Sequence, residues 1–236
     1  MLVVGFPTGA FQANCFLVAP GEGGPCVIID PGQDAEEPIA EALRKHRLAP
    51  VAVLLTHGHL DHIYSVTPVC DGNDVPAWIH PDDRHLLGDP LRGVSAEAAA
   101  FFGDLQLREP REVREMTDGV ELDLAGLLMT VDHTPGHTQG SVGFRSTTDE
   151  GGQLFFSGDT LFAGSIGRTD LPGGSMAMLT ESLRTKVLSL DDETVVLPGH
   201  GPTTTIGRER VSNPFLTGMI DLTDPKSSHL GRGRGI

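Results

Sequence analysis

The sequence predicts an α/β (α+β) fold, and three observations lead to this prediction. An apolar run at residues 26–30, a helical pattern at 35–47 and an apolar run at 51–55 follow one another in βαβ order, which implies a parallel strand pair with a right-handed crossover. A helix followed by a strand at 194–197 repeats this step near the end of the chain. Between them, short apolar runs with glycine-containing turns indicate a sheet.

The first half of the chain is expected to open with strands at residues 2–6 and 14–19, because turn-forming Pro and Gly clusters bound each apolar run. Asp30-Pro31-Gly32 ends the third strand. Ile39, Leu43 and Arg47 then recur at helical spacing. The remaining elements expected here are helices at 61–69, 82–87 and 96–102 and a strand at 77–80.

The second half is expected to form successive strands and then one long amphipathic helix. The expected strands are 112–116, 120–124, 127–132, 141–145 and 153–156. Apolar side chains recur at three- and four-residue intervals between Met176 and Leu190, which predicts a helix with one buried face. We expect residues 1–225 to form a single domain and residues 226–236, which lack apolar content, to form a disordered tail.

Composition excludes several classes of function. The formal net charge is −15 and the pI is about 4.9, which disfavours binding to nucleic acid. No segment is apolar for the length of a membrane span and the N-terminus lacks a basic leader, so a soluble, cytoplasmic protein is expected. Three widely spaced cysteines without a CxxC pair indicate buried free thiols rather than disulfides or a thiolate zinc site.

The segment Thr56–His62, with sequence THGHLDH, directly follows the strand expected at 51–55. It contains three imidazoles and one carboxylate, which are ligand types that Zn²⁺ or Fe²⁺ accepts. Burying four such groups without a metal would cost solvation energy that nothing offsets. The segment therefore predicts a metal site at the carboxyl end of this strand, where open α/β sheets usually place their chemistry.

Three more strands end in polar clusters, at residues 133–137, 157–160 and 198–201. Together the four clusters supply five histidines and two aspartates as candidate metal ligands: His57, His59, Asp61, His62, His137, Asp159 and His200. A catalytic Zn²⁺ takes about four ligands and keeps one position for water. Seven protein groups with a bridging carboxylate and a bridging hydroxide would thus make a hydrolytic site with two divalent metals, zinc first and iron or manganese as alternatives.

These segments resemble the metallo-β-lactamase superfamily, and within it the compact bacterial glyoxalase II-like hydrolases. The motifs THxHxDH, TPGHT, GDT and PGHG occur here in the order found in that family, and residues 161–172 resemble the loop that follows its bridging aspartate. The resemblance spans residues 2 to 220. It implies a four-layer αββα sandwich with the metals at one rim between the two sheets.

Carried over residue by residue, the resemblance implies one metal on His57, His59 and His137. A second metal would be held by Asp61, His62 and His200, and Asp159 would bridge the two. Asp61 and Asp159 would also act in catalysis by orienting the nucleophile.

Three further residues have less specific assignments. Asp30 matches an aspartate that braces the metal-binding loop in the family, although a turn-capping Asp before Pro explains the bare sequence equally well. His133 adjoins the TPGHT turn and is expected to support the site or to face solvent. Arg168 is assigned to substrate contact by analogy, with a solvated loop arginine as the alternative. His46, His80, His85 and His229 are expected not to be ligands.

The function expected from the resemblance is hydrolysis of small thioesters such as S-lactoylglutathione, by attack of a metal-bridging hydroxide. An iron-dependent persulfide dioxygenase with one metal, held at the positions of His57, His137 and Asp159, and a lactonase are the alternatives. A β-lactamase is disfavoured because those enzymes characteristically lack the bridging aspartate. Only residues 201–236 follow His200, whereas glyoxalase II uses a long helical C-terminal domain to bind glutathione, so the thiol carrier stays open. The oligomeric state is also open.

Overall fold

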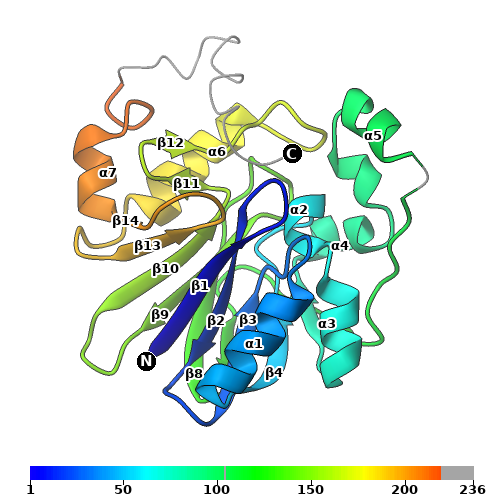
Figure 1. The fold of residues 1–236 in the computed structure, drawn as a ribbon. Coiled ribbons are helices and arrows are strands. Elements are labelled where there is room, and N and C mark those ends of the chain that lie inside the picture. The colour runs from blue at the N-terminus through cyan, green and yellow to red at the C-terminus, as the bar shows by residue number, and fades with distance from the viewer. Residues whose placement is uncertain (104, 219–236) are drawn as a thin grey trace.

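The first of two six-stranded sheets comes from the N-terminal half of the chain, in a computed structural model that describes residues 1–103 and 105–218. Its strands lie in the order β1 (Leu2–Thr8), β2 (Ala13–Ala19), β3 (Pro25–Ile29), β4 (Ala49–Leu54), β5 (Ala77–Ile79) and β6 (Val113–Glu115). β1 to β3 are antiparallel and β3 to β6 are parallel. The crossovers α1 (Glu36–His46) and α3 (Val66–Asn73) confirm the expected βαβ order (Figure 1).

The second sheet comes from the C-terminal half. Its order is β14 (Thr204–Thr205), β13 (Val195–Pro198), β10 (Gln153–Gly158), β9 (Val142–Thr147), β8 (Leu127–His133) and β7 (Glu121–Leu124). Only the β10–β13 pair is parallel, because α6 (Met176–Ser182) and the π-helical segment η3 (Leu183–Val187) connect these two strands. A small hairpin, β11 (Leu161–Phe162) and β12 (Ser165–Ile166), follows β10, and α7 (Ile206–Ser212) follows β14.

Four layers follow from the alternation of side chains along the strands. In β3 and β4, Ile28 and Val53 face an apolar cluster that includes residues of α1 and α3. Their neighbours Val27 and Leu54 face the opposite way, into a second cluster between the two sheets. In β10, Phe155 faces a third cluster that includes residues of α6, η3 and α7.

The cluster between the sheets holds the two halves of the chain together. Phe16 of β2 meets Phe156 of β10 in an edge-to-face contact with ring centroids 5.4 Å apart. Phe144 of β9 is fully buried in the same cluster. The layer order is therefore helix, sheet, sheet, helix, which confirms the predicted four-layer sandwich.

Four predicted elements differ from the structure. The helix predicted over residues 82–87 is divided into α4 (Pro81–Arg84) and η1 (His85–Leu87). The long helix predicted between Met176 and Leu190 is α6 followed by the π-helical η3, which ends at Val187.

The helix predicted over residues 61–69 is split into α2 (Leu60–Ile63) and α3, because the amide of Ser65 donates to the carbonyl of Pro31 and its hydroxyl donates to Glu36. The strand predicted at 112–116 belongs to the first sheet, where β6 pairs parallel with β5, and not to the second. The predicted tail at 226–236 lies outside the described residues.

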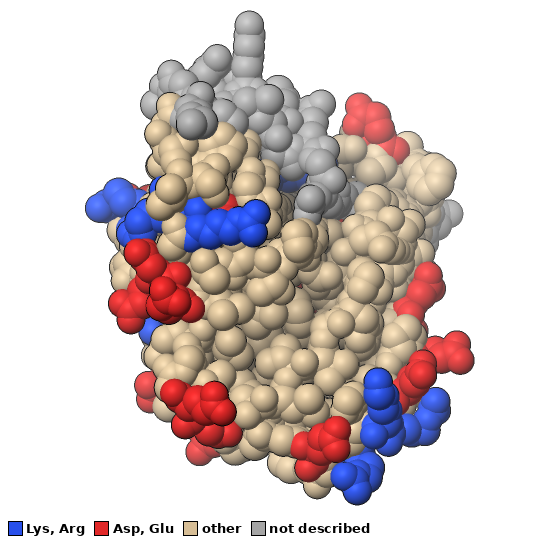
Figure 2. All heavy atoms as spheres, turned by 60° about the vertical axis from the view of Figure 1, so that its left-hand side comes forward, with Lys and Arg blue, Asp and Glu red and all other residues tan. Residues whose placement is uncertain are grey.

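The remaining short helices lie between β5 and β6: α4 (Pro81–Arg84), η1 (His85–Leu87), η2 (Pro90–Gly93) and α5 (Ala96–Phe102). All three cysteines are free and buried, as expected, and burial raises the pKa of the Cys26 thiol to about 12. No helix within residues 1–103 and 105–218 is long and apolar enough to cross a bilayer. On the face in Figure 2, Lys and Arg side chains form small separate groups with acidic side chains beside them.

Replacement of Phe144 by alanine is expected to lower the free energy of unfolding by about 3–5 kcal/mol, because it leaves a cavity between the sheets. Urea denaturation monitored by circular dichroism measures the change. Phe101→Ala is the control, since the side chain of Phe101 is 85% exposed and its removal should change stability by less than about 0.5 kcal/mol. Equal losses in the two variants would contradict this packing.

Candidate metal centre

The seven predicted metal ligands come together at one end of the two sheets. The segments that carry them directly follow β4 of the first sheet and β8, β10 and β13 of the second. All seven side chains are at most 3% exposed. A glycine makes part of this approach possible, because a Cβ atom on Gly199 would lie 2.1 Å from Oδ1 of Asp159. The spacing of the motifs in the sequence thus corresponds to one buried cluster.

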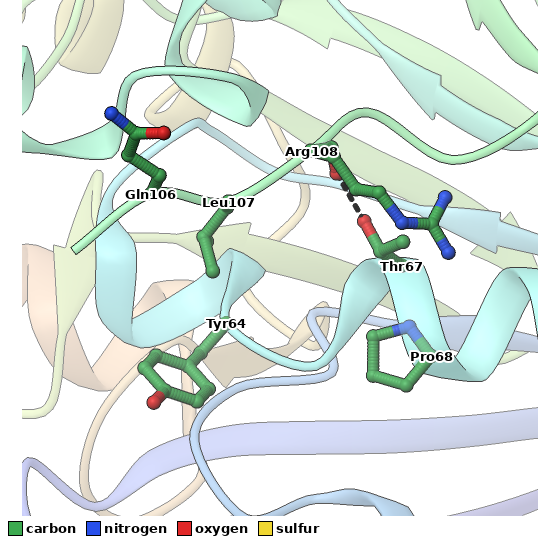
Figure 3. Close-up of a pocket in the computed structure, with 6 residues that line it drawn as sticks. All are labelled: Tyr64, Thr67, Pro68, Gln106, Leu107 and Arg108. Carbon is green, nitrogen blue, oxygen red and sulfur yellow. Dashed lines mark hydrogen bonds between the residues drawn. The ribbon is translucent and has the colours of Figure 1, made fainter.

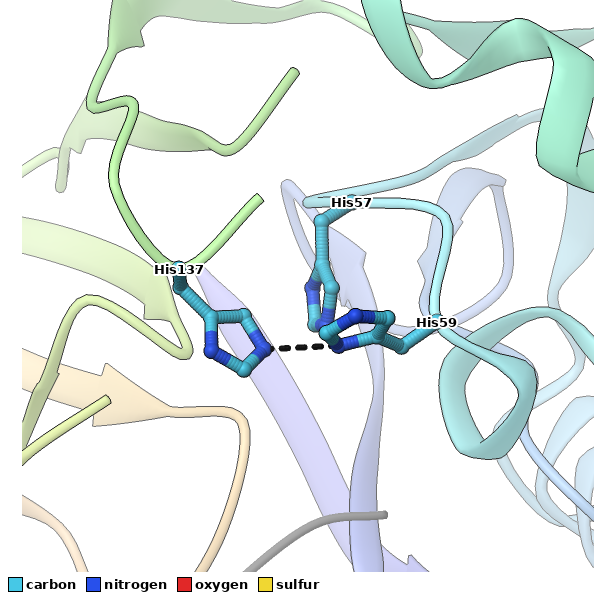
Figure 4. A group of neighbouring side chains, drawn as sticks. All are labelled: His57, His59 and His137. Atoms are coloured by element: carbon cyan, nitrogen blue, oxygen red, sulfur yellow. Dashed lines mark hydrogen bonds between the residues drawn. The ribbon is translucent and has the colours of Figure 1, made fainter. Parts of the chain in front are cut away.

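His57, His59 and His137 form the first group. Their rings point toward one another from two loops, as Figure 4 shows. Nδ1 of His59 lies 2.8 Å from Nε2 of His137, and the ring centroid of His57 lies 4.9 and 4.8 Å from those of His59 and His137.

Asp61, His62 and His200 form the second group. Nε2 of His200 lies 3.2 Å from Oδ2 of Asp61 and 3.2 Å from Nε2 of His62. Each group therefore takes side chains from loops of both sheets.

Asp159 lies between the two groups. Its Oδ2 is 3.6 Å from Nε2 of His137 and 3.6 Å from Nε2 of His200. Its Oδ1 is 3.5 Å from Nε2 of His62. One carboxylate thus faces both groups, which is the position that a bridging residue requires.

Hydrogen bonds on the far side of the rings decide which nitrogen faces the centre. Nδ1 of His137 donates to the carbonyl of Arg168 at 2.8 Å, and Nδ1 of His200 donates to the carbonyl of Phe11 at 3.1 Å. A carbonyl oxygen can only accept, so Nδ1 carries the hydrogen in both rings. Nε2 is therefore the nitrogen that each of these rings presents to the centre.

Asp30 and Thr56 brace the loop behind the rings. The carboxylate of Asp30 accepts from the amide of Thr56 at 2.8 Å, from its hydroxyl at 2.6 Å and from Nδ1 of His62 at 3.0 Å. The Thr56 hydroxyl in turn lies 3.1 Å from Nδ1 of His57, where it can accept. These are the contacts expected of a bracing aspartate. Sequence reasoning gave no role to Thr56, although its place directly before His57 was a usable signal.

The polar atoms at the centre fit bound metal. Nε2 of His57, both oxygens of Asp61 and Oδ1 of Asp159 are buried and have no hydrogen-bond partner within residues 1–103 and 105–218. Such atoms are costly unless something compensates them. Around Asp61 and Asp159, oxygen and nitrogen atoms of neighbouring candidates lie 3.2 to 3.8 Å apart. Tetrahedral sites with bonds of about 2.0–2.2 Å separate ligand atoms by about 3.3–3.6 Å.

The acidic side chains raise the pKa of His62. Burial alone would lower this pKa, but the carboxylates of Asp61, Asp159 and Asp30 outweigh burial and raise it to about 10. The same balance, burial against Asp159 and Asp61, raises the pKa of His200. In the metal-free protein, the proton that His62 keeps at neutral pH compensates part of the buried carboxylate charge.

The first group behaves in the opposite way. Burial, followed by the neighbouring imidazoles, holds the pKa of His57 well below its usual range. Burial and His137 do the same for His59. Both rings are therefore neutral at physiological pH and ready to donate a lone pair to a metal.

Arg168 and His133 lie beside the centre and not in it. The guanidinium of Arg168 forms a two-fold ion pair with Asp170 at 2.7 and 3.1 Å, while its backbone carbonyl holds His137. Nε2 of His133 lies 2.9 Å from the carbonyl of Gln139, and its ring stacks on His80 at 4.1 Å. His80, Asp82 and His133 are close enough to share a metal. The rings of His80 and His133 are stacked face to face, however, so the lone pairs of their nitrogens lie in nearly parallel planes and do not converge on one point.

Two hollows lie beside α2, and one of them reaches the second group. A small one is lined by Phe11, Gln33, Leu60, Asp61, Tyr64 and Phe102, and therefore reaches a predicted ligand. A larger one begins at Tyr64 and continues along Thr67, Pro68 and residues 106–108, where the Thr67 hydroxyl donates to the carbonyl of Arg108 (Figure 3). Tyr64 lines both hollows, and the larger one mixes apolar side chains with Thr67, Gln106 and Arg108.

The family model of the metallo-beta-lactamase superfamily matches residues 8–200. An uncharacterized protein of Mycobacterium tuberculosis is 50% identical over 222 residues, which cover 93% of this chain and 99% of that protein. The hydroxyacylglutathione hydrolase GloC of Haemophilus influenzae is 37% identical over 215 residues, 89% of this chain and 95% of GloC.

Solved structures have a similar fold. The B3 metallo-beta-lactamase BLEG-1 superposes with a TM-score of 0.81 at 38% identity, covering 92% of this chain and 100% of that one. TTHA1623, solved in a di-iron-bound form, gives a TM-score of 0.75 at 41% identity, with 90% and 100% covered. ETHE1 from Myxococcus xanthus gives 0.72 at 25% identity, with 92% and 85% covered.

Zinc binding to the metal-free protein at pH 7 is expected to release protons. Because the pKa of His62 is about 10, its ring is protonated at pH 7, and a metal must displace that proton. Affinity should therefore rise as pH rises toward that pKa. Calorimetric titration in buffers of different ionisation enthalpy counts the protons. Asp30→Asn removes one of the carboxylates that raise the pKa and should reduce the count, whereas an affinity that falls between pH 6 and 8 would contradict the assignment.

Proposed function

Because the chain belongs to the metallo-β-lactamase superfamily, we propose that it is a metal-dependent hydrolase of thioesters formed by a low-molecular-weight thiol, of the S-lactoylglutathione type. The observation that carries the proposal is the position of Asp159, whose carboxylate faces His137 on one side and His62 and His200 on the other. A carboxylate between two ligand groups suits a centre with two metals.

The first metal would be held by His57, His59 and His137, the second by Asp61, His62 and His200, and Asp159 would contact both. Zinc is the metal we propose first, while iron and manganese accept the same nitrogen and oxygen ligands. When bound, two such metals supply a water molecule that is acidic enough to ionise near neutral pH and a positive charge that polarises a carbonyl group.

The protein's own side chains orient the reaction. Asp61 would bind the second metal through one oxygen, and its other oxygen, which has no hydrogen-bond partner among the described residues, can accept a hydrogen bond from the attacking water and fix its direction. The rings of His57 and His59 are neutral at physiological pH, and the single N–H proton that a neutral imidazole keeps is too weakly acidic to be given to a leaving group. A thiolate with a pKa near ~8.5 leaves with little need of such a proton, whereas the amine of an amide needs one.

The name of GloC supports this substrate class, since that relative is a hydroxyacylglutathione hydrolase and aligns over almost its whole length. The likeness to a B3 metallo-beta-lactamase favours a second candidate, the hydrolysis of a β-lactam. Asp159 argues for the thioester, because β-lactamases of this superfamily characteristically lack an aspartate there. A lactone offers the same electrophilic carbonyl and belongs in the same assay.

A persulfide dioxygenase with one iron would use His57, His137 and Asp159. It would leave both buried oxygens of Asp61 without a partner, together with His62 and His200 beside them. Two bound metals account for these atoms and one does not. Metal content and oxygen consumption separate the two activities, because the dioxygenase contains one iron and consumes O₂ while the hydrolase contains two metals and does not.

Metal-replete protein is expected to release free thiol from S-lactoylglutathione or from an analogue built on another thiol, measured with a thiol reagent. Asp159→Asn should lower kcat at least about 100-fold, because it removes a charge that faces both ligand groups. Asp132→Asn is the matched control, since Asp132 is also buried but pairs with Arg145, and should keep kcat within a factor of two.

Absence of thiol release from every thioester tested, with two metals bound, would overturn the thioester proposal. Lactone, β-lactam and persulfide substrates in parallel assays identify which of the other activities takes its place.

A further inference from the structure

Asp83 is a buried carboxylate in α4 that is bonded to both loops of the first ligand group. Asp83 is only 1% exposed to solvent. Oδ2 accepts from the amide of Gly58 at 2.8 Å and from the hydroxyl of Thr138 at 2.7 Å. Oδ1 accepts from the amide of Gly140 at 2.8 Å. Three donors occupy its two oxygens, so Asp83 is not itself a metal ligand.

These donors belong to loops of different sheets. Gly58 stands between His57 and His59 in the loop after β4, whereas Thr138 directly follows His137 in the turn after β8. A single carboxylate therefore connects the two loops that together carry the first group. The amide of Val142 also donates to the carbonyl of Thr56 at 2.7 Å, which joins the bases of the same loops. Asp83 holds the same loops together farther along, next to the metal-binding histidines.

Both glycines are needed for this approach. A Cβ atom on Gly140 would lie 2.6 Å from Cγ of Asp83. A Cβ atom on Gly58 would lie 2.7 Å from a side-chain carbon of Leu86 and 3.0 Å from the backbone oxygen of Asp83. Only residues without a side chain let both amides come this close to the carboxylate.

α4 gives Asp83 a fixed base. The helix begins directly after β5, with Pro81 in its first turn, and Nδ1 of His80 accepts from the amide of Asp82 at 3.3 Å. The carboxylate is thereby anchored to the first sheet and reaches the turn of the second.

We propose that Asp83 is a positioning residue that sets the separation between His57 and His59 on one side and His137 on the other, and thereby the affinity of the first metal site. Asp30 lies behind both groups, since it binds His62 directly and holds Thr56, whose hydroxyl contacts His57. The inference rests on the proposed metal centre and is independent of the substrate.

The variant Asp83→Asn tests this with almost no change in volume. An amide has one oxygen and one NH₂ group. If its oxygen faces Gly140, the NH₂ faces the amide of Gly58, and if the group is turned over, the NH₂ faces the amide of Gly140. Two donors oppose each other either way, so one of the two loops must move away.

Glu209 of α7 offers a matched control. It is also 1% exposed and accepts from three donors, the amide of Gly164 at 2.7 Å, the hydroxyl of Thr204 at 2.6 Å and the side-chain amide of Asn213 at 2.9 Å. None of these three donors is next to a predicted metal ligand in the sequence, whereas Gly58 and Thr138, which donate to Asp83, each are. Glu209→Gln therefore removes a comparable buried carboxylate network away from the centre.

The experiment compares the full chain, stripped of metal, as wild type, Asp83→Asn and Glu209→Gln. Co²⁺ is titrated with visible absorption as the readout and a chelator as competitor, and Tm is measured without metal. Both variants should lower Tm. Only Asp83→Asn should weaken one of the two Co²⁺ sites, by about 10–100-fold, and leave the other within twofold of wild type.

A second arm uses His137→Ala. Because this change removes the side chain that Asp83 positions, adding Asp83→Asn to it should weaken the remaining Co²⁺ site no further. Equal weakening of both sites, unchanged affinities in Asp83→Asn, or the same loss in Glu209→Gln would overturn the positioning role. Wild-type protein that binds two metals but cleaves no thioester would overturn the proposed substrate instead. The Co²⁺ affinities of Asp83→Asn and Glu209→Gln would still decide whether Asp83 positions the first ligand group.

Discussion

The structure depends on one electrostatic constraint, the burial of the carboxylates Asp30, Asp61 and Asp159 at the ends of two sheets. Ionised carboxylates are stable away from water only when hydrogen bonds or positive charges compensate them. Asp30 receives three hydrogen bonds, whereas both oxygens of Asp61 and one of Asp159 receive none. Protons on His62 and His200 can balance this charge, and two metal ions can balance it while also using the lone pairs of the rings.

The centre is a property of the interface between the sheets. Each ligand group combines side chains after β4 of the first sheet with one after β8 or β13 of the second. Packing such as the Phe16–Phe156 contact therefore stabilises the fold and also holds the ligands in place, because a shift of one sheet against the other would separate the ligands within each group. Hydrogen bonds across the interface, from Val142 to Thr56 and from Gly58 and Thr138 to Asp83, refine the same spacing.

Relatives that share this fold carry names of different activities, which is understandable if the buried centre and the surface around it have separate roles. The chain resembles a hydroxyacylglutathione hydrolase and a B3 metallo-beta-lactamase at nearly the same identity, 37% and 38%. A buried metal centre of this kind can serve more than one reaction, because bound metals activate water and polarise a substrate whichever substrate is brought to them. On one fold, function differs with the residues around such a site, and here Phe11, Leu60, Tyr64 and Phe102 lie around a small hollow beside Asp61.

The sequence by itself determined the class of fold, the seven candidate ligands and the order of the ligand loops, because each motif is local and each follows an apolar strand. Tertiary structure alone decided three matters. Asp83 acts on donors 25 to 57 residues away, and nothing in its neighbourhood in the sequence marks it. Arg168 touches the centre through its backbone carbonyl, which every residue type has, while Asp170 holds its guanidinium. The break between α2 and α3 arises because Ser65 bonds to Pro31 and Glu36, contacts that form only once the chain has folded.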